Sequence, residues 1–256
     1  MRAFIAFFKK EILENIRSGR FVLLGILFLA FGIMNPAIAK LTPWLLETLS
    51  AELEESGMVV TSVTVDALTS WTQFFKNIPM ALIALVLVYS GSFTREYESG
   101  TLVLMLTKGL SRYKVVLAKA SVMLMTWTAG YFLCYGVTYE YNAYFWDNSV
   151  ARELGAAVFN WWLYGILMVC LTVLFSVLSK TSSGVLLGVG GAAVAFYLIG
   201  MLPKIKDYSP ASLMQSAGLL AGTEGAGDHL PSVIVAAALC VFSVAVSIPL
   251  MNKKKI

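Results

Sequence analysis

Long uncharged runs alternate with short charged segments along this chain. Each of five runs lies between two charged residues: Arg20–Lys40 encloses 19 uncharged residues, Lys76–Arg95 encloses 18, Lys119–Glu140 encloses 20, Glu153–Lys180 encloses 26 and Lys180–Lys204 encloses 23. The sixth run, Leu230–Asn252, is 23 residues long. About 20 apolar residues cross a ~30 Å hydrocarbon layer as a helix, the form that satisfies its own backbone hydrogen bonds in lipid. The pattern predicts an all-α polytopic membrane protein, a single domain over residues 1–256, with spans at about 21–39, 78–94, 115–138, 155–178, 184–202 and 231–251.

The residues before the first span have an amphipathic pattern. Ile5, Phe8, Ile12 and Ile16 recur at three- and four-residue steps, with charged residues between them. An apolar stripe beside lysine and arginine is typical of a helix that lies in the membrane interface. We expect Ser18-Gly19 to end this helix.

Two segments at the predicted outer side are neither clear spans nor simple loops. Residues 41–77 predict two helices, at about 44–55 and 65–76, with Gly57 ending the first. They form either a small outer cap or gate, or a helical hairpin on the bilayer surface. Residues 208–223 are uncharged but short and rich in glycine, which favours a re-entrant or interfacial helix.

The segment from Arg95 to Lys114 combines charges, helix breakers and a short apolar block. Ser99 or Thr101 can start a helix, Gly109 can end it in a left-handed conformation, and Ser111 can cap the next span. The block 102–106 would extend only ~8 Å as a helix, far too short to cross a bilayer. It is either a surface helix resting on its own bundle or an apolar docking site for another protein.

The distribution of lysine and arginine predicts the orientation. With both termini in the cytoplasm, 14 of the 19 basic residues lie inside, in agreement with the positive-inside rule. The inner set is Arg2, Lys9, Lys10, Arg17, Arg20, Arg95, Lys108, Arg112, Lys114, Lys119, Lys180 and Lys253 to Lys255. The net charge of +4 is therefore mainly a topology signal and not a sign of nucleic-acid binding.

Composition changes the picture little, except in the fifth span. Hydrophobic residues make up 58% of the chain and charged residues 13%, about half the charge of a soluble domain. Gly184, Gly188 and Gly191 in the fifth span would let another helix backbone approach closely. This contact is either within the same bundle or at the seam of a dimer.

The sequence has no catalytic or nucleotide-binding motif. It lacks the GxxxxGK[ST] phosphate-binding loop, the GxSxG and HExxH motifs, and cysteine or histidine spacing for a metal. No charged residue occupies the centre of a span, which disfavours ion-coupled carriers. The only histidine, His229, is expected in a solvated outer loop beside Asp228. We therefore predict no catalytic residue, no metal site and no cofactor bound to this chain.

Three stretches resemble the membrane subunits of ATP-binding cassette exporters of the ABC-2 type. They are residues 9–17, Lys-Lys-Glu-Ile-Leu-Glu-Asn-Ile-Arg; residues 96–102, Glu-Tyr-Glu-Ser-Gly-Thr-Leu; and residues 106–112, Leu-Thr-Lys-Gly-Leu-Ser-Arg, which lead to Lys119. The similarity extends over the six-span layout. This chain has Thr107-Lys108-Gly109 where many relatives carry a proline before the Ser-Arg pair.

The resemblance implies a division of roles. Residues 4–17 would be the interfacial connecting helix, with Lys9, Lys10, Glu11, Glu14 and Arg17. Residues 99–106 would be a coupling helix seated in a separate ATPase subunit. The implied docking residues are Glu96, Glu98, Ser99, Gly100, Thr101, Leu102, Leu104, Met105 and Arg112. By the resemblance, Glu96 and Glu98 would position the coupling helix or pair with basic residues of the connecting helix or partner, and Gly100 would allow the turn. Arg112 and Lys119 would face lipid phosphates or an acidic patch of the ATPase.

By the same resemblance, the chain would be a plasma-membrane permease that works as a homodimer with ATP-binding cassette ATPase subunits. ATP and Mg would be bound by the partner, and the exported substrate would be amphipathic, lipid-like or a peptide. The alternative is a non-transporting membrane scaffold or sensor that recruits a cytoplasmic partner through residues 95–114.

Overall fold

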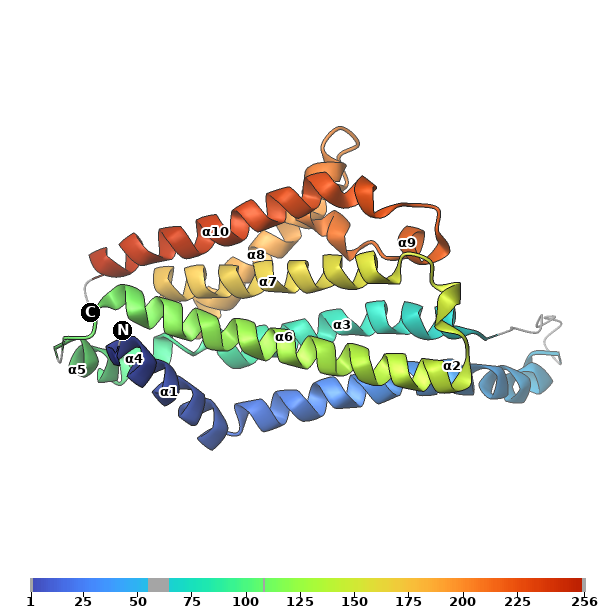
Figure 1. Cartoon of the computed structure of the whole chain (residues 1–256), viewed down its shortest axis with the longest axis horizontal. Coiled ribbons are helices and arrows are strands. Elements are labelled where there is room, and N and C mark those ends of the chain that lie inside the picture. The colour runs from blue at the N-terminus through green and yellow to red at the C-terminus, as the bar shows by residue number, and fades with distance from the viewer. Residues whose placement is uncertain (1, 55–64, 108, 255–256) are drawn as a thin grey trace.

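The computed structural model describes residues 2–54, 65–107 and 109–254, and most of these residues are helical (Figure 1). The described residues include six long helices: α2 (Arg20–Glu54), α3 (Ala67–Ser90), α6 (Arg112–Phe145), α7 (Leu154–Leu178), α8 (Ser182–Gly200) and α10 (Leu230–Lys253). Each is long and apolar enough to cross a membrane. No strand occurs among the described residues. The predicted all-α fold with six spans is confirmed.

The remaining elements are short, apart from the first helix. They are α1 (Arg2–Arg17), α4 (Thr94–Glu98), α5 (Thr101–Thr107), α9 (Ala217–Ala221) and the 3-10 turns η1 (Asn148–Val150), η2 (Lys206–Tyr208), η3 (Pro210–Met214) and η4 (Ala226–His229). Both chain termini, α4 and α5 lie at one end of the bundle, which we call the terminal end (Figure 1). The tip of α2 and α9 lie at the opposite end, the distal end.

Helix α7 forms the centre of the bundle and packs against α3, α6, α8 and α10. Aromatic side chains fill the space between α3 and α6. The ring centroids of Trp127 and Tyr131 are 5.2 Å apart, and those of Phe74 and Tyr131 are 5.8 Å apart. By contrast, α2, α8 and α10 present exposed apolar side chains such as Leu23, Leu187 and Val241. Such surfaces suit helices that border lipid, where apolar side chains meet no water.

The break between α1 and α2 occurs where the sequence predicts it. α1 ends at Arg17, and Gly19 has a φ of 71° before α2 begins at Arg20. Glycine adopts this left-handed conformation without the penalty that a Cβ imposes. The bend directs α1 away from the axis of α2 (Figure 1).

The first span is longer than predicted, because α2 continues without a break to Glu54. The sequence predicts a separate helix after Pro43, but both Pro36 and Pro43 lie inside α2. Pro36 has no N–H to offer the carbonyl of Gly32, and the hydroxyl of Thr138 donates to that carbonyl at 3.1 Å. A tertiary contact thus replaces one hydrogen bond that proline removes.

The second outer helix of the 41–77 segment is also part of a span. α3 starts at Ala67, capped by Asp66, and continues through Pro79 to Ser90. Trp71 and Phe74 are buried in the bundle and do not rest on a bilayer surface. The predicted separate hairpin at 41–77 is therefore wrong for the described residues, and the end expected at Gly57 lies outside them.

The 208–223 segment folds as η3 and α9, not as one re-entrant or interfacial helix. Ser209 caps η3 by accepting a hydrogen bond from the N–H of Ala211. Leu213, Leu219 and Leu220 are buried, and η3 and α9 pack on α7. His229, expected in solvent, is buried, with its Nε2 3.3 Å from Glu224 Oε2.

Of the three glycines that the sequence suggests for close helix packing in α8, two pack within the chain. A Cβ at Gly188 would collide with the ring of Phe175 on α7, and a Cβ at Gly184 would collide with Ser179. Gly191 faces open space. Gly184 and Gly188 therefore belong to the α7–α8 contact, which is one of the two alternatives that the sequence left open.

Candidate functional site

The inner face of α1 is formed by Phe7, Glu11 and Asn15, which are spaced four residues apart and are all buried. Of the apolar stripe predicted for this helix, Ile5 and Ile16 are 48% and 53% exposed, whereas Phe8 and Ile12 are half-buried. Ile5 and Ile16 are thus free to lie in the membrane interface, while a carboxylate and an amide face the bundle. The side-chain oxygen of Asn15 has no hydrogen-bond partner, but its amide donates to the Glu11 carbonyl.

Glu11 faces a buried lysine. Lys119, in the second turn of α6, is 2% exposed, and its Nζ lies 3.0 Å from Glu11 Oε2 and 3.1 Å from Glu96 Oε2. The same ammonium donates to the carbonyl of Ser92 at 3.0 Å. Lys119 therefore does not face lipid phosphates or an ATPase. It joins α1, α4 and α6 from the inside.

Lys10 extends this cluster toward the surface. Its Nζ lies 2.7 Å from Glu96, 2.6 Å from Glu14 and 3.0 Å from Glu11. Glu96 thus pairs with a basic residue of α1, which is one of the alternatives that the resemblance implies. Burial lowers the pKa of Lys10, but the hydrogen bonds to Glu14 and Glu96 and the charge of Glu11 outweigh it and raise this pKa overall. Burial raises the pKa of Glu14, but the bond to Lys10 lowers it overall.

We call Lys10, Glu11, Glu14, Glu96 and Lys119 the ion cluster. The three carboxylates are close enough together to hold a metal ion. Lys10 contacts one oxygen of each, however, so its ammonium occupies the place that a cation would take. Removing one partner of a buried ion pair leaves an uncompensated charge, which costs ~3–5 kcal/mol. The cluster therefore fixes how α1 sits against α4 and α6.

Helix α4 has further contacts with the other side of the bundle. The hydroxyl of Thr94 lies 2.9 Å from that of Ser182 at the start of α8. The hydroxyl of Tyr97 donates to Met251 Sδ, near the end of α10, at 3.3 Å. Together with Glu96, these residues connect a five-residue helix to α1, α6, α8 and α10. A displacement of α4 would act on four helices at once.

Helix α5 follows α4 after a sharp turn. Gly100 at the turn has a φ of 67°, and Gly109 beyond the helix has a φ of 86°, the left-handed conformation that the sequence predicts for Gly109. Leu102 is completely buried and anchors α5 to the bundle, so it does not belong to an outward docking face. Val103 and Leu104 are 38% and 64% exposed. A groove of about 560 Å³ lies beside α5, lined in part by Val103, Leu106 and Asn252.

The other predicted docking and connecting residues lie on α1 and around α4 and α5. Glu98, Ser99, Thr101, Lys9 and Arg17 are exposed, and Met105 is half-buried. Lys108 lies outside the described residues. Arg112 is wrongly predicted to face phosphates or an acidic partner: its Nη1 donates to backbone carbonyls at the end of α10. Arg112 is therefore occupied within the chain.

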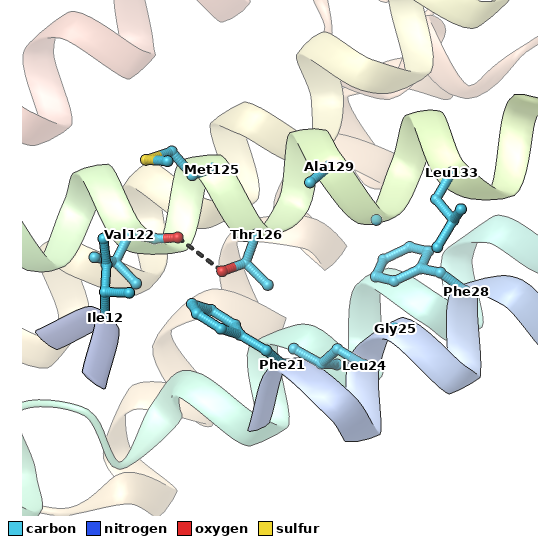
Figure 2. A pocket seen from close by; sticks show the side chains of 11 residues that line it. Ile12, Phe21, Leu24, Gly25, Phe28, Val122, Met125, Thr126, Ala129 and Leu133 are labelled. Atoms are coloured by element: carbon cyan, nitrogen blue, oxygen red, sulfur yellow. Dashed lines mark hydrogen bonds between the residues drawn. The ribbon is translucent and has the colours of Figure 1, made fainter. Parts of the chain in front are cut away.

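Two apolar pockets open between the spans. The first, of about 320 Å³, lies between α2 and α6, with Phe21, Phe28 and Leu133 around it and Ile12 of α1 at one end (Figure 2). Its one polar side chain, Thr126, donates to the carbonyl of Val122, as Figure 2 shows. The second, of about 420 Å³, lies between α3, α7 and α8. Both can hold hydrocarbon.

The sequence did not reveal that Glu11 and Lys119 are partners, and it did not reveal the contacts at the C-terminus. The only available signal was a charged residue near the start of the third predicted span, since a charge there is rarely left unpaired.

The family described as "ABC-2 family transporter protein" matches residues 5–209 of the chain. No curated protein and no solved structure matches this chain.

Proposed function

Because the chain belongs to the ABC-2 transporter family, we propose that it is a permease subunit driven by a separate ATPase. The site of coupling is the segment formed by α4 and α5, residues 94–107. ATP and Mg bind to the ATPase, and this chain exports an amphipathic, lipid-like or peptide substrate. The chain itself carries no nucleotide-binding motif.

The contacts of α4 carry this proposal. One short helix touches α1, α6, α8 and α10, and the helix next to it presents two apolar side chains outward. A small exposed apolar patch beside polar residues marks an interaction site. The burial of Leu102 fixes α5 to the bundle, so a force on Val103 and Leu104 would reach α4.

We call α4 and α5 (residues 94–107) the coupling segment. The ion cluster is a second connection between this segment and the spans. When the ATPase dimer closes on ATP and moves α5, Glu96 shifts with α4 and pulls on Lys10 and Lys119. Rigid-body shifts of packed helices are a common form of switching. The result is a tilt of the spans around a pathway for substrate. The apolar pockets between the spans support an amphipathic substrate.

The proposal includes an orientation in the plasma membrane. The terminal end faces the cytoplasm, because it carries both termini and α5 (Figure 1) and because most basic residues of the sequence then lie inside. Two copies pair in the working transporter. The apolar surface of α8 around Gly191, which is open in the single chain, supports such a pairing.

The test is removal of the outward apolar side chains. Val103→Asp with Leu104→Asp should reduce co-purification of the ATPase, identified by its Walker motif, at least ~10-fold, since each buried apolar side chain contributes ~1.5–3 kcal/mol. Val150→Asp, at an exposed position in η1 beyond the C-terminal end of α6, is the matched control and should leave the complex intact. A double variant that retains the ATPase at the wild-type level would overturn the docking site.

A further inference from the structure

The end of the last span is held by the first residue of α6. Arg112 Nη1 donates to the carbonyls of Met251, Asn252 and Lys254 at 2.8, 3.2 and 2.7 Å. The final carbonyls of a helix have no partner within the helix, and a basic side chain can satisfy them. Arg112 thus closes the C-terminus of α10 from a residue 139 positions earlier in the chain.

Lys254 satisfies the last carbonyls of another span, α7. Its Nζ donates to the carbonyls of Val177 and Ser179, at the end of α7, at 2.7 Å each. The ammonium also lies 3.9 Å from the ring centroid of Tyr97 on α4, a cation–π contact. A cation at a helix C-terminus is favoured by the helix dipole. The residue after α10 therefore joins α10, α7 and α4 at one point.

We use the name C-terminal clamp for the four residues that make these contacts: Tyr97, Arg112, Met251 and Lys254. Along the chain, α4 is separated from α7 and α10 by many residues, so a displacement of α4 reaches their ends directly only through such contacts. The ion cluster provides no such route, because its residues lie on α1, α4 and α6. Helices α7 and α10 also pack along each other, so a pull on one moves both.

We propose that the C-terminal clamp transmits motion of the coupling segment to the fourth and sixth spans, with Arg112 and Lys254 as positioning residues. This inference rests on the proposed coupling function. It assigns a role to the last residues of the chain, which lie beyond the family match at residues 5–209.

The neighbouring residue Lys253 provides a matched control. Lys253 is exposed, whereas Lys254 is half-buried in the clamp, although both are lysines at the same helix end. Lys254→Ala and Arg112→Ala should keep the ATPase bound but lower permease-dependent stimulation of its ATP hydrolysis at least ~5-fold, the low end of measured coupling between sites. Lys253→Ala should behave as wild type, and Lys254→Arg should recover most of the stimulation.

The outcomes separate the clamp from the proposed function. If the wild-type chain does not co-purify with an ATPase, the proposed function fails. If the ATPase remains bound and Lys254→Ala stimulates it as well as Lys253→Ala does, the clamp inference fails and the proposed function stands.

A second measurement keeps the clamp intact, in case the alanine variants do not fold. Spin labels at the exposed positions Lys180 and Lys253 report the distance between the α7–α8 turn and the end of α10. A second pair at Glu98 and Lys253 reports the distance from α4. Both distances should stay constant when Mg-ATP and vanadate are added to the complex, because the clamp moves as a unit. Separation of the Glu98 pair on ATP binding would overturn the inference.

Discussion

Lys119 donates to a carboxylate oxygen of Glu11 and to the carbonyl of Ser92, and its almost completely buried ammonium also forms a close ion pair with Glu96. A buried charge is tolerated where it is paired and hydrogen-bonded in this way. The cost of removing the lysine therefore comes less from the lost bonds than from the two carboxylates left behind. Glu11 and Glu96 would then remain buried, with only Lys10 to compensate them.

Lys119→Met tests this account. The variant should lose ~3–5 kcal/mol of stability and ~6–20 °C of melting temperature, followed by tryptophan fluorescence in detergent. Lys9→Met, at an exposed position on α1, is the control and should change little. Adding Glu11→Gln and Glu96→Gln to Lys119→Met should restore part of the loss. A single variant as stable as the control would show that the ion cluster does not hold α1 in place.

Lys254 differs from Lys119 because it has carbonyl partners and no carboxylate. Burial, and then the nearby charge of Lys180, lower its pKa from 10.5 to about 8. In the unfolded chain the amine stays protonated up to about pH 10.5, so between pH 8 and 10.5 the unfolded state binds more protons than the folded state. The clamped state should therefore become more stable as pH rises through 8, and the neutral amine can still donate to Val177 and Ser179.

Competitive acetylation across a pH series, read by mass spectrometry, measures this pKa. Reaction of Lys254 should reach half its maximum near pH 8, and Lys180→Ala should move the midpoint upward because it removes a like charge. A midpoint that stays unchanged in Lys180→Ala would contradict the electrostatic part of the account.

Among the elements, α2 depends most clearly on a neighbour. Thr138 donates to the Gly32 carbonyl that Pro36 leaves free and accepts from Asn35, which in turn accepts from Asn77 on α3. This polar network connects α2, α3 and α6 within the spans. Proline inside a membrane helix is tolerated where such a side chain satisfies the freed carbonyl.

Thr138→Val should cost ~1–3 kcal/mol of stability, because it leaves the Gly32 carbonyl buried without a donor. The cost should be smaller in a Pro36→Ala background, where residue 36 again offers its N–H to Gly32. Thr42→Val is the control, since the hydroxyl of Thr42 bonds within its own exposed turn. Equal costs in both backgrounds, measured as thermal unfolding in a double-mutant cycle, would refute the role given to Thr138.

The elements also show what the sequence could predict. Span number and the turns at Gly19 and Gly109 depend on local composition and backbone freedom, and all were predictable. The first span was expected to end at about residue 39, but α2 continues through Pro43 to Glu54. The inward face of α1 depends on Lys119, 108 residues from Glu11 in the chain. A pattern of apolar residues cannot show such a partner, so it predicted a helix in the membrane interface and did not show that Glu11 faces the bundle.

At the scale of the whole molecule, the coupling segment is the place where distant parts of the chain meet. α4 contacts α1 and α6 through the ion cluster, α8 through Thr94, and α10 and Lys254 through Tyr97. Away from this segment, η3 and α9 both pack on α7. This arrangement places the mechanical connections at one end of the bundle and leaves the apolar flanks for lipid or a second copy.

Site-specific photo-crosslinking in the native complex tests the central claim most directly, that an ATPase holds this chain at α5. A photoreactive amino acid replaces Leu104, which is 64% exposed on α5, or Tyr144, which is 83% exposed at the C-terminal end of α6. The account predicts an adduct with the Walker-motif ATPase from position 104 and none from position 144. An adduct from position 144, or none from position 104 in a complex that contains the ATPase, would contradict it.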